Sequence, residues 1–266
     1  QDYFVAIFLG GGLMCITGFL DDMFDIKPTI RLFIQIFGSS LGLYFVGGVK
    51  LLQTGSDFSA FFIFSNFATV FLMVWFINVF NFMDGIDGMA TSGAIFFSAF
   101  IGLFLNSIEV ESMSYLLLVV SFSSLAFLFF NWTPAKMFLG DSGSYFFGYI
   151  FSILLIITVK NGYLSFITWL IILCYFITDT TFTTVYRFLF IKDWYKTHRS
   201  HAYQNLARIL KNHKVITSSV ILFHLFYLMP LALLSCIYQA YDLIFLIFAF
   251  LPVLIFVIKF GPRFES

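Results

Sequence analysis

Nine long apolar stretches follow one another along this chain of 266 residues. The hydrocarbon core of a bilayer is about 30 Å thick and needs about 20 apolar residues per helix. Hydrophobic residues make up 61% of the chain and charged residues 11%, against about 45–50% and about 25% in soluble domains. The stretches are apolar on all sides, which excludes the alternating pattern of a membrane β-barrel. The sequence therefore predicts an all-α, polytopic membrane bundle with nine spans: 3–20, 31–49, 58–77, 89–106, 113–130, 144–159, 163–186, 214–236 and 241–259.

The basic residues predict how this bundle is oriented, because lysine and arginine gather in cytoplasmic connections. If the first span ends in the cytoplasm, only Lys50 and Lys160 of the 14 lysines and arginines lie outside. We therefore expect one membrane-embedded domain over residues 1–266, with its long polar connections in the cytoplasm. The chain opens with Gln1 almost at the membrane edge, so we also expect it to lack one or more upstream spans.

The first polar connection carries two adjacent carboxylates at the end of a span. Asp21 and Asp22 repel each other unless a cation or a proton donor lies nearby. Arg31 and Gln35 are four residues apart at the start of the next helix. They share one face of that helix and are expected to look back at the carboxylate pair. A solvated helix end is the alternative interpretation.

The second connection carries two amides and two carboxylates at every third position: Asn78, Asn81, Asp84 and Asp87. On a helix, such residues lie one above another. Gly85 and Gly88 then allow another group to approach the backbone closely. An acidic residue costs about 2.5–3.5 kcal/mol at the centre of a membrane helix. This grouping therefore indicates a binding site or a wet cavity, with a plain loop as the alternative.

The third connection places Asp141 between glycine and serine residues, directly before a predicted helix. A helix N-terminus favours anions such as phosphate, while a carboxylate favours a hard cation. A turn with a serine N-cap would explain the same residues without any function.

The fourth connection, about 187–213, is basic and contains His198, Arg199 and His201. Phosphate binding is favoured over contact with anionic lipid headgroups, because the acidic connections that need a cation are predicted on the same side. A transition-metal site is weakly supported, since the two histidines have no third ligand nearby. Asp179 is expected to pair with Arg187, and we interpret His213 and His224 as structural residues.

Carboxylates together with arginine and histidine are typical of a site for phosphates bridged by a divalent cation. Mg²⁺ uses one or two carboxylates and completes its coordination with phosphate oxygens and water. Phosphoryl transfer depends on positioning and charge neutralisation, which this set of side chains would supply.

In the same order, these connections resemble the motifs of the polyprenyl-phosphate N-acetylhexosamine-1-phosphate transferase family, of the glycosyltransferase family 4 type. The matching segments are Asp21 to Asp25 with Arg31 and Gln35, Asn78 to Gly88, Phe138 to Ser144, and His198 to Gln204. The last segment lacks the consecutive histidines of many relatives and is similar to the version in enzymes that start O-antigen synthesis. Family members usually have ten or eleven spans.

The resemblance implies that undecaprenyl phosphate attacks a UDP-N-acetyl sugar of the GlcNAc, FucNAc or QuiNAc type and releases UMP. It implies Mg²⁺ as cofactor, with Mn²⁺ as a substitute, in a bacterial inner membrane, and it implies no nucleic acid partner. A homodimer is left open, as is the identity of any catalytic base. The implied catalytic residues are Asp21, Asp22, Asp84 and Asp87; the substrate-binding residues are Asn78, Asn81, Arg31, His198, Arg199 and His201; the metal ligands are Asp141 and Asn81.

An ion- or proton-coupled transporter that relays through intramembrane aspartates is the alternative function. It predicts acids near the bilayer midplane and often inverted repeats, whereas these acids lie mostly at one face and no repeat is visible. An intramembrane aspartyl protease would need a second aspartate inside an earlier span. We therefore expect the four connections to form one magnesium-dependent site on the cytoplasmic face.

Overall fold

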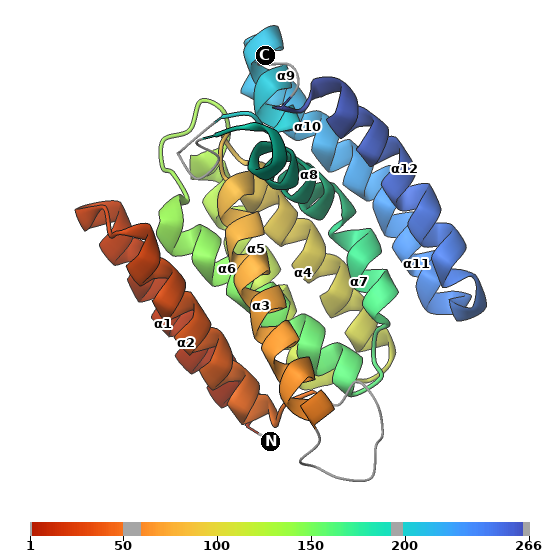
Figure 1. The fold of residues 1–266 in the computed structure, drawn as a ribbon. Helices are drawn as coiled ribbons and strands as arrows, with labels where there is room; N and C mark the ends of the chain where they lie inside the picture. The colour runs from red at the N-terminus through yellow and green to blue at the C-terminus, as the bar shows by residue number, and fades with distance from the viewer. Residues whose placement is uncertain (1, 50–59, 193–198, 263–266) are drawn as a thin grey trace. The chain divides into compact units, whose positions relative to one another are not determined.

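The computed structural model describes residues 2–49, 60–192 and 199–262, and all regular elements in these segments are helices (Figure 1). They are α1 (Tyr3–Phe24), α2 (Pro28–Val46), α3 (Ala60–Met83), α4 (Met89–Ser107), α5 (Glu111–Asn131), α6 (Gly140–Lys160), α7 (Phe166–Ile172), α8 (Cys174–Phe190), α9 (Ala202–Leu210), α10 (His213–Phe223), η1 (His224–Leu228), α11 (Met229–Ile237), η2 (Gln239–Tyr241) and α12 (Asp242–Phe260). Within these residues, eight helical segments are long and apolar enough to cross a bilayer, and the bent pair α7–α8 makes up to nine. The predicted all-α, multi-pass membrane fold is confirmed.

The span predicted over 163–186 is divided into two helices. Its two parts, α7 and α8, meet at an angle of 79°. Leu173 lies between them with φ −92° and ψ 3°, yet no glycine or proline marks the bend in the sequence. Just beyond it, the Phe176 ring packs where Gly93 has no side chain, 2.4 Å from an ideal Cβ at that position. The bend therefore coincides with a tertiary contact that the neighbouring sequence does not predict.

The span predicted over 214–236 is continuous, although it contains a turn of π-helix at η1. Pro230 follows this turn and has no backbone N–H to continue the regular hydrogen-bond ladder. His224 is 2% exposed, and its Nδ1 lies 2.8 Å from the Val220 carbonyl oxygen. Such a buried environment fits the structural role predicted for His224.

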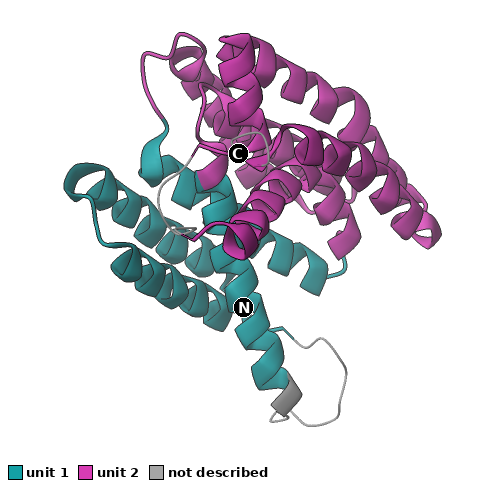
Figure 2. Ribbon diagram, turned by 45° about the horizontal axis from the view of Figure 1, so that its top comes forward, with its two compact units in different colours: residues 1–81, 139–163 teal, residues 82–138, 164–266 magenta. Residues whose placement is uncertain are grey.

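The chain divides into two compact units, which are coloured separately in Figure 2. Unit 1 comprises residues 1–81 and 139–163, and unit 2 comprises residues 82–138 and 164–266. Unit 1 therefore contains α1, α2, most of α3, and α6. The boundary falls inside the second polar connection, directly after Asn81.

In unit 1, two glycines allow α6 to lie against its neighbours. A Cβ at Gly18 of α1 would stand 2.3 Å from the carbonyl carbon of Asp141, at the start of α6. A Cβ at Gly148 would stand 2.5 Å from the Cα of Ile77 in α3. Because backbone meets backbone at both positions, any side chain would force the helices apart. The contact at Gly18 positions the first turn of α6, and that at Gly148 holds the middle of the helix.

Lys160, one of the two basic residues predicted on the outer side of the membrane, lies at the other end of unit 1 from Asp141. The Nζ of Lys160 donates to the carbonyl oxygens of Val46, at 2.6 Å, and Gly48, at 2.9 Å. These carbonyls belong to the C-terminus of α2, where a positive charge is favourable. Lys160 and Asp141 lie near opposite ends of α6, as the predicted orientation requires.

Candidate active site

Asp141 is the centre of a polar cluster in unit 1. It is the second residue of α6 and follows Gly140, whose φ of 67° suits glycine. The Nδ2 of Asn81 donates to Asp141 Oδ1 at 2.6 Å. On the other carboxylate oxygen, Asp141 Oδ2 lies 3.5 Å from Arg31 Nη1. The side chain of Asp141 remains 26% exposed, so solvent and ligands can reach it.

Asp21 forms the tightest ion pair of this cluster. Its Oδ2 accepts from Arg31 Nη1 at 2.6 Å, and its Oδ1 accepts from the backbone N–H of Ile26 at 2.9 Å. The Asp21 side chain is only 4% exposed, whereas that of Arg31 is 29% exposed. The sequence-based expectation that Arg31 faces the carboxylate pair is confirmed for Asp21.

Asp22 has a different environment from its neighbour. It is exposed, and its two carboxylate oxygens accept from the backbone N–H groups of Asp141, at 3.0 Å, and Ser142, at 3.2 Å. These donors are among the unpaired N–H groups at the start of α6, so Asp22 caps that helix from α1. This tertiary cap holds the first and third polar connections together.

Asn78, the other amide predicted to belong to the site, binds within the helices of unit 1. Asn78 Nδ2 donates to Gln35 Oε1 at 3.0 Å and to the Val74 carbonyl oxygen at 2.8 Å. Asn78 therefore links α3 to α2 near the cluster, and it shares α3 with Asn81.

The cluster suits a hard divalent cation. The carboxylates of Asp21 and Asp141 share one guanidinium, that of Arg31, and the Asp22 carboxylate binds the backbone of Asp141 beside them. This leaves a surplus of negative charge, which favours a cation. Among the described residues, no group of three or more His, Cys, Asp or Glu side chains could hold a metal ion alone. Mg²⁺ needs only one or two carboxylates when phosphate oxygens complete its shell, so Asp141 and the amide of Asn81 fit it.

In unit 2, the segment after α3 is a loop rather than a continued helix. The expectation that Asp84 and Asp87 continue the helical face of Asn78 and Asn81 is wrong, because α3 ends at Met83. Gly88, with φ 74°, then starts α4. The left-handed backbone at this glycine breaks the helical register. Asp84 and Asp87 therefore lie on a turn.

Tyr203 of α9 holds this loop at its first half. Its hydroxyl donates to the Phe82 carbonyl oxygen at 2.6 Å and accepts from the backbone N–H of Gly85 at 3.0 Å. Burial, together with the negative charges of Asp179 and Asp84, raises the pKa of the Tyr203 phenol well above its ordinary value. Tyr203 thus stays protonated and acts as a donor. Sequence reasoning missed it, although it belongs to the segment 198–204.

The second half of the loop contacts His213, which the sequence predicts to be a structural residue. Asp87 Oδ2 accepts from the backbone N–H of Ala135 at 3.2 Å, and its Oδ1 lies 3.6 Å from His213 Nδ1. His213 is 45% exposed at its side chain. The expectation that His213 is merely structural overlooked this contact, because 126 residues separate the two side chains in the chain.

The fourth connection is anchored by Asp179. This carboxylate is fully buried and accepts from the backbone N–H groups of Ala202, at 2.9 Å, and Tyr203, at 3.2 Å. The expected pair with Arg187 is wrong: Arg187 Nη1 instead lies 3.5 Å from Ser200 Oγ. The N–H groups at the start of α9 have no partner within the helix, and the Asp179 carboxylate accepts from two of them.

The three predicted residues of this connection differ in accessibility. Arg199 is exposed, whereas His201 is 2% exposed, with Nδ1 3.6 Å from Asp179 Oδ1 and its ring beside that of Tyr203. His201 is therefore enclosed beside Asp179 and Tyr203, whereas Arg199 is accessible. His198 lies outside the described residues.

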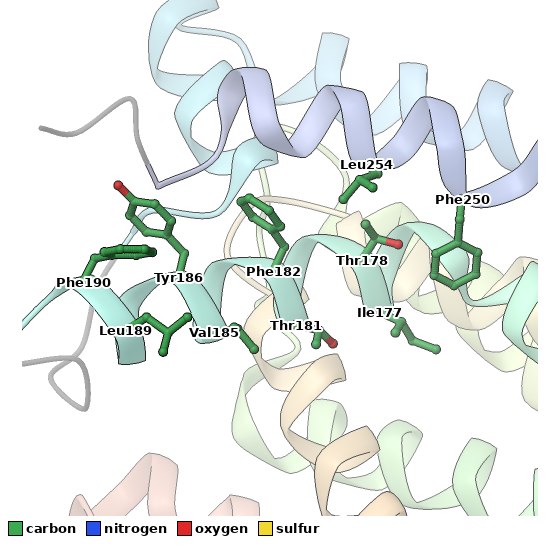
Figure 3. Close-up of a pocket in the computed structure, with 10 residues that line it drawn as sticks. All are labelled: Ile177, Thr178, Thr181, Phe182, Val185, Tyr186, Leu189, Phe190, Phe250 and Leu254. Carbon is green, nitrogen blue, oxygen red and sulfur yellow. The ribbon is translucent and has the colours of Figure 1, made fainter. Parts of the chain in front are cut away.

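Two cavities on the membrane-spanning helices are almost entirely apolar. One, of about 450 Å³, lies between α8 and α12 in unit 2, with Phe182, Val185 and Leu254 on its walls (Figure 3). The other, of about 710 Å³, lies between α2 and α3 in unit 1, beside Leu43 and Phe71. Neither contains a predicted site carboxylate. Both offer surfaces for hydrocarbon rather than for a nucleotide.

Comparison with known proteins relates the chain to a family of glycosyl transferases. Residues 4–159 match the model of the family described as glycosyl transferase family 4. The chain is 31% identical over 224 residues, 79% of its length, to "Probable undecaprenyl-phosphate N-acetylglucosaminyl 1-phosphate transferase" of Bacillus subtilis, of which this covers 60%. It is 29% identical over 155 residues, 52% of its length, to the phospho-N-acetylmuramoyl-pentapeptide-transferase of Clostridium perfringens, of which this covers 46%. The chain thus matches about half of these relatives' length.

Proposed function

The chain belongs to glycosyl transferase family 4, and on that premise we propose that it transfers N-acetylglucosamine 1-phosphate from the UDP-sugar to undecaprenyl phosphate. The Asp141 cluster carries this proposal, since it joins a partly exposed carboxylate, an amide and a guanidinium at a helix start. The family predicted from the four motifs is confirmed. N-acetylglucosamine is chosen because the Bacillus subtilis relative carries that sugar in its name.

In the proposed reaction, an oxygen of the lipid phosphate attacks the sugar-proximal phosphorus, and the phosphoanhydride bond to UMP breaks. The products are an undecaprenyl diphosphate sugar and UMP. No strong base is required, because a phosphate monoester has its second pKa at about 6 and is largely dianionic near neutral pH. Asp21 and Asp22 then serve to hold the reaction centre, through Arg31 and through the start of α6.

Asp141 and Asn81 would hold the magnesium ion. When bound, Mg²⁺ neutralises negative charge on the phosphates and on the departing UMP. The side chain of Arg31 is partly exposed beside them and would orient a phosphate oxygen through its guanidinium. Asn78 would contribute by holding α3 against α2.

The nucleotide sugar would be recognised by residues of unit 2. Asp84 and Asp87 lie on the loop that Tyr203 and Ala135 hold, and a carboxylate accepts hydrogen bonds from the hydroxyl or amide groups of such a ligand. Exposed Arg199 offers a positive charge to the diphosphate, with His198 as a further contact. His201 would act indirectly, by supporting the loop from its buried position.

The apolar cavities would offer hydrocarbon surface to the polyprenyl tail. The excess of lysine and arginine in the polar connections supports a reaction on the cytoplasmic side, where UDP-sugars occur. We therefore propose a bacterial inner-membrane enzyme that starts a lipid-linked polysaccharide such as O-antigen.

Membranes containing the protein can test this proposal directly. They are incubated with undecaprenyl phosphate and, separately, with UDP-GlcNAc, UDP-FucNAc or UDP-QuiNAc, and the lipid products are weighed by mass spectrometry. We expect a diphosphate-linked GlcNAc product together with UMP. Absence of a lipid-linked sugar with all three donors, from protein shown to be folded, would reject the transferase.

Chelation should stop the reaction reversibly. EDTA would remove the cation that balances the Asp141 cluster, and addition of Mg²⁺ or Mn²⁺ in excess should restore UMP release. The control is Ca²⁺, whose larger radius and longer oxygen distances fit an octahedral Mg²⁺ site poorly. Undiminished UMP release in EDTA would contradict the proposed cofactor.

Tyr203→Phe should weaken nucleotide-sugar binding. The variant removes the hydroxyl that holds Phe82 and Gly85, so the loop with Asp84 and Asp87 loses an anchor. We expect KM for the UDP-sugar to rise about 10-fold, which corresponds to about 1.4 kcal/mol. Tyr227→Phe is the matched control, because its hydroxyl also donates to a carbonyl oxygen, that of Phe248, in unit 2. Equal KM values for the two variants would show that Tyr203 does not support the binding loop.

A further inference from the structure

We propose that Tyr145 is a positioning residue that holds Asp21 and Asp141 in one arrangement and prepares Asp141 for the cation. The inference rests on the proposed function, and Tyr145 lies outside the motif segments that indicated it. The residue follows Asp141 by four positions in α6, so both side chains project from the same face of the helix.

The hydroxyl of Tyr145 lies between the two carboxylates. Its oxygen is 3.0 Å from Asp21 Oδ2 and 3.1 Å from Asp141 Oδ2. Arg31 Nη1 donates to the same oxygen at 3.2 Å. Because a phenol carries a single proton, it can donate to only one of these carboxylates at a time. Tyr145 therefore couples the positions of Asp21 and Asp141 through one shared hydrogen atom.

The phenol is itself held firmly. Tyr145 is 2% exposed, and the backbone contacts at Gly18 and Gly148 keep α6 close to α1 and α3. A buried ring on a packed helix has little freedom to rotate, so its hydroxyl defines where the two carboxylates can lie. A hydrogen bond to a ligating carboxylate fixes its orientation and commonly changes metal affinity or activity by about 10–100-fold when it is removed.

Without the hydroxyl, Asp21 and Asp141 would be linked only by their contact with each other and by their unequal contacts with Arg31. Arg31 Nη1 is much closer to Asp21, at 2.6 Å, than to Asp141, at 3.5 Å. Asp141 would then retain the Asn81 amide as its close side-chain partner and could turn away from the cluster. We therefore expect a misplaced metal ligand rather than an altered sugar pocket.

The test compares Tyr145→Phe with Tyr149→Phe in the full chain. Tyr149 is the matched control: it is the next residue on the same face of α6, it is fully buried, and its hydroxyl donates to the Ala6 carbonyl oxygen at 2.8 Å. Mn²⁺ is titrated into each purified variant and followed by electron paramagnetic resonance, with Asp141→Asn as the reference for a lost ligand. UMP release and the thermal unfolding midpoint are measured on the same samples.

In Tyr145→Phe we expect the Kd for Mn²⁺ to rise about 10-fold and kcat to fall, with KM for the UDP-sugar unchanged. Tyr149→Phe should lower the unfolding midpoint by at least as much but keep wild-type Mn²⁺ affinity. If Asp141→Asn loses Mn²⁺ while Tyr145→Phe keeps both affinity and kcat, the role of Tyr145 is rejected and the metal site stands. If Asp141→Asn binds Mn²⁺ like the wild type, the metal site and the role of Tyr145 are both rejected.

Discussion

Asp141→Asn should reduce UMP release by at least about 10²–10³-fold, the scale on which loss of one electrostatic element at a reaction centre is felt. The amide has the size of the carboxylate but lacks the charge that a hard cation requires. Because the Asp22 cap binds the backbone N–H of Asp141 and not its side chain, the start of α6 should be preserved. UMP release and the thermal unfolding midpoint measure the two effects separately.

Asp242→Asn is the matched control for this change. Asp242 is 7% exposed and accepts from Ser235 Oγ at 2.7 Å and from Ser165 Oγ at 3.1 Å in unit 2. The same loss of charge there removes hydrogen bonding worth about 1 kcal/mol and should lower stability while UMP release persists. Retained turnover in Asp141→Asn at saturating Mg²⁺ would remove Asp141 from the proposed metal site.

Gly18→Ala should impair both stability and turnover, although it adds a single methyl group to an α1 residue. Its Cβ would lie 2.3 Å from the carbonyl carbon of Asp141 and 2.4 Å from the backbone N of Ser142. The start of α6 would have to move away from α1, at a cost of about 1–3 kcal/mol. Because Asp141 moves with it, a displacement of about 1 Å can lower turnover by about 10²-fold.

Gly12→Ala provides the control on the same helix. An added Cβ at Gly12 meets no atom within 4 Å, and alanine is favoured over glycine in a helix interior by about 0.5–1 kcal/mol. This variant should unfold at or above the wild-type midpoint and turn over normally. Comparable losses in the two variants would show that helix flexibility, and not the contact with α6, governs the effect of Gly18→Ala.

The membrane fold was predictable from the sequence because apolar length is a local property. Helices such as α4 and α5 fall within a few residues of their predicted spans, since about 20 apolar residues suffice to cross the hydrocarbon core. The bend at Leu173 was not predictable, because it carries no glycine or proline and coincides with a contact between Phe176 and Gly93 from distant parts of the chain.

The polar residues of the candidate site were predicted from their grouping in the sequence, whereas the tyrosines that bind them were not. Asp21 and Arg31 are ten residues apart, and helical spacing correctly predicted that Arg31 faces Asp21. Gln35, expected on the same side, instead accepts from Asn78. Tyr145 and Tyr203 look like ordinary aromatic residues in a chain with 13 tyrosines. Only their hydroxyl contacts with Asp21, Asp141, Phe82 and Gly85 distinguish them.

The sequence by itself determined that the protein is a multi-pass helical membrane protein of this transferase family. The length of an apolar stretch and the spacing of a motif both depend only on residues that are close together in the chain. Only the tertiary structure decided which carboxylate does what: Asp21 pairs with Arg31, Asp22 caps α6, and Asp179 caps α9. From its sequence position alone, an aspartate could bind either a cation or the N-terminus of a helix. Which of the two it binds depends on which donor the folded chain brings within about 3 Å of the carboxylate.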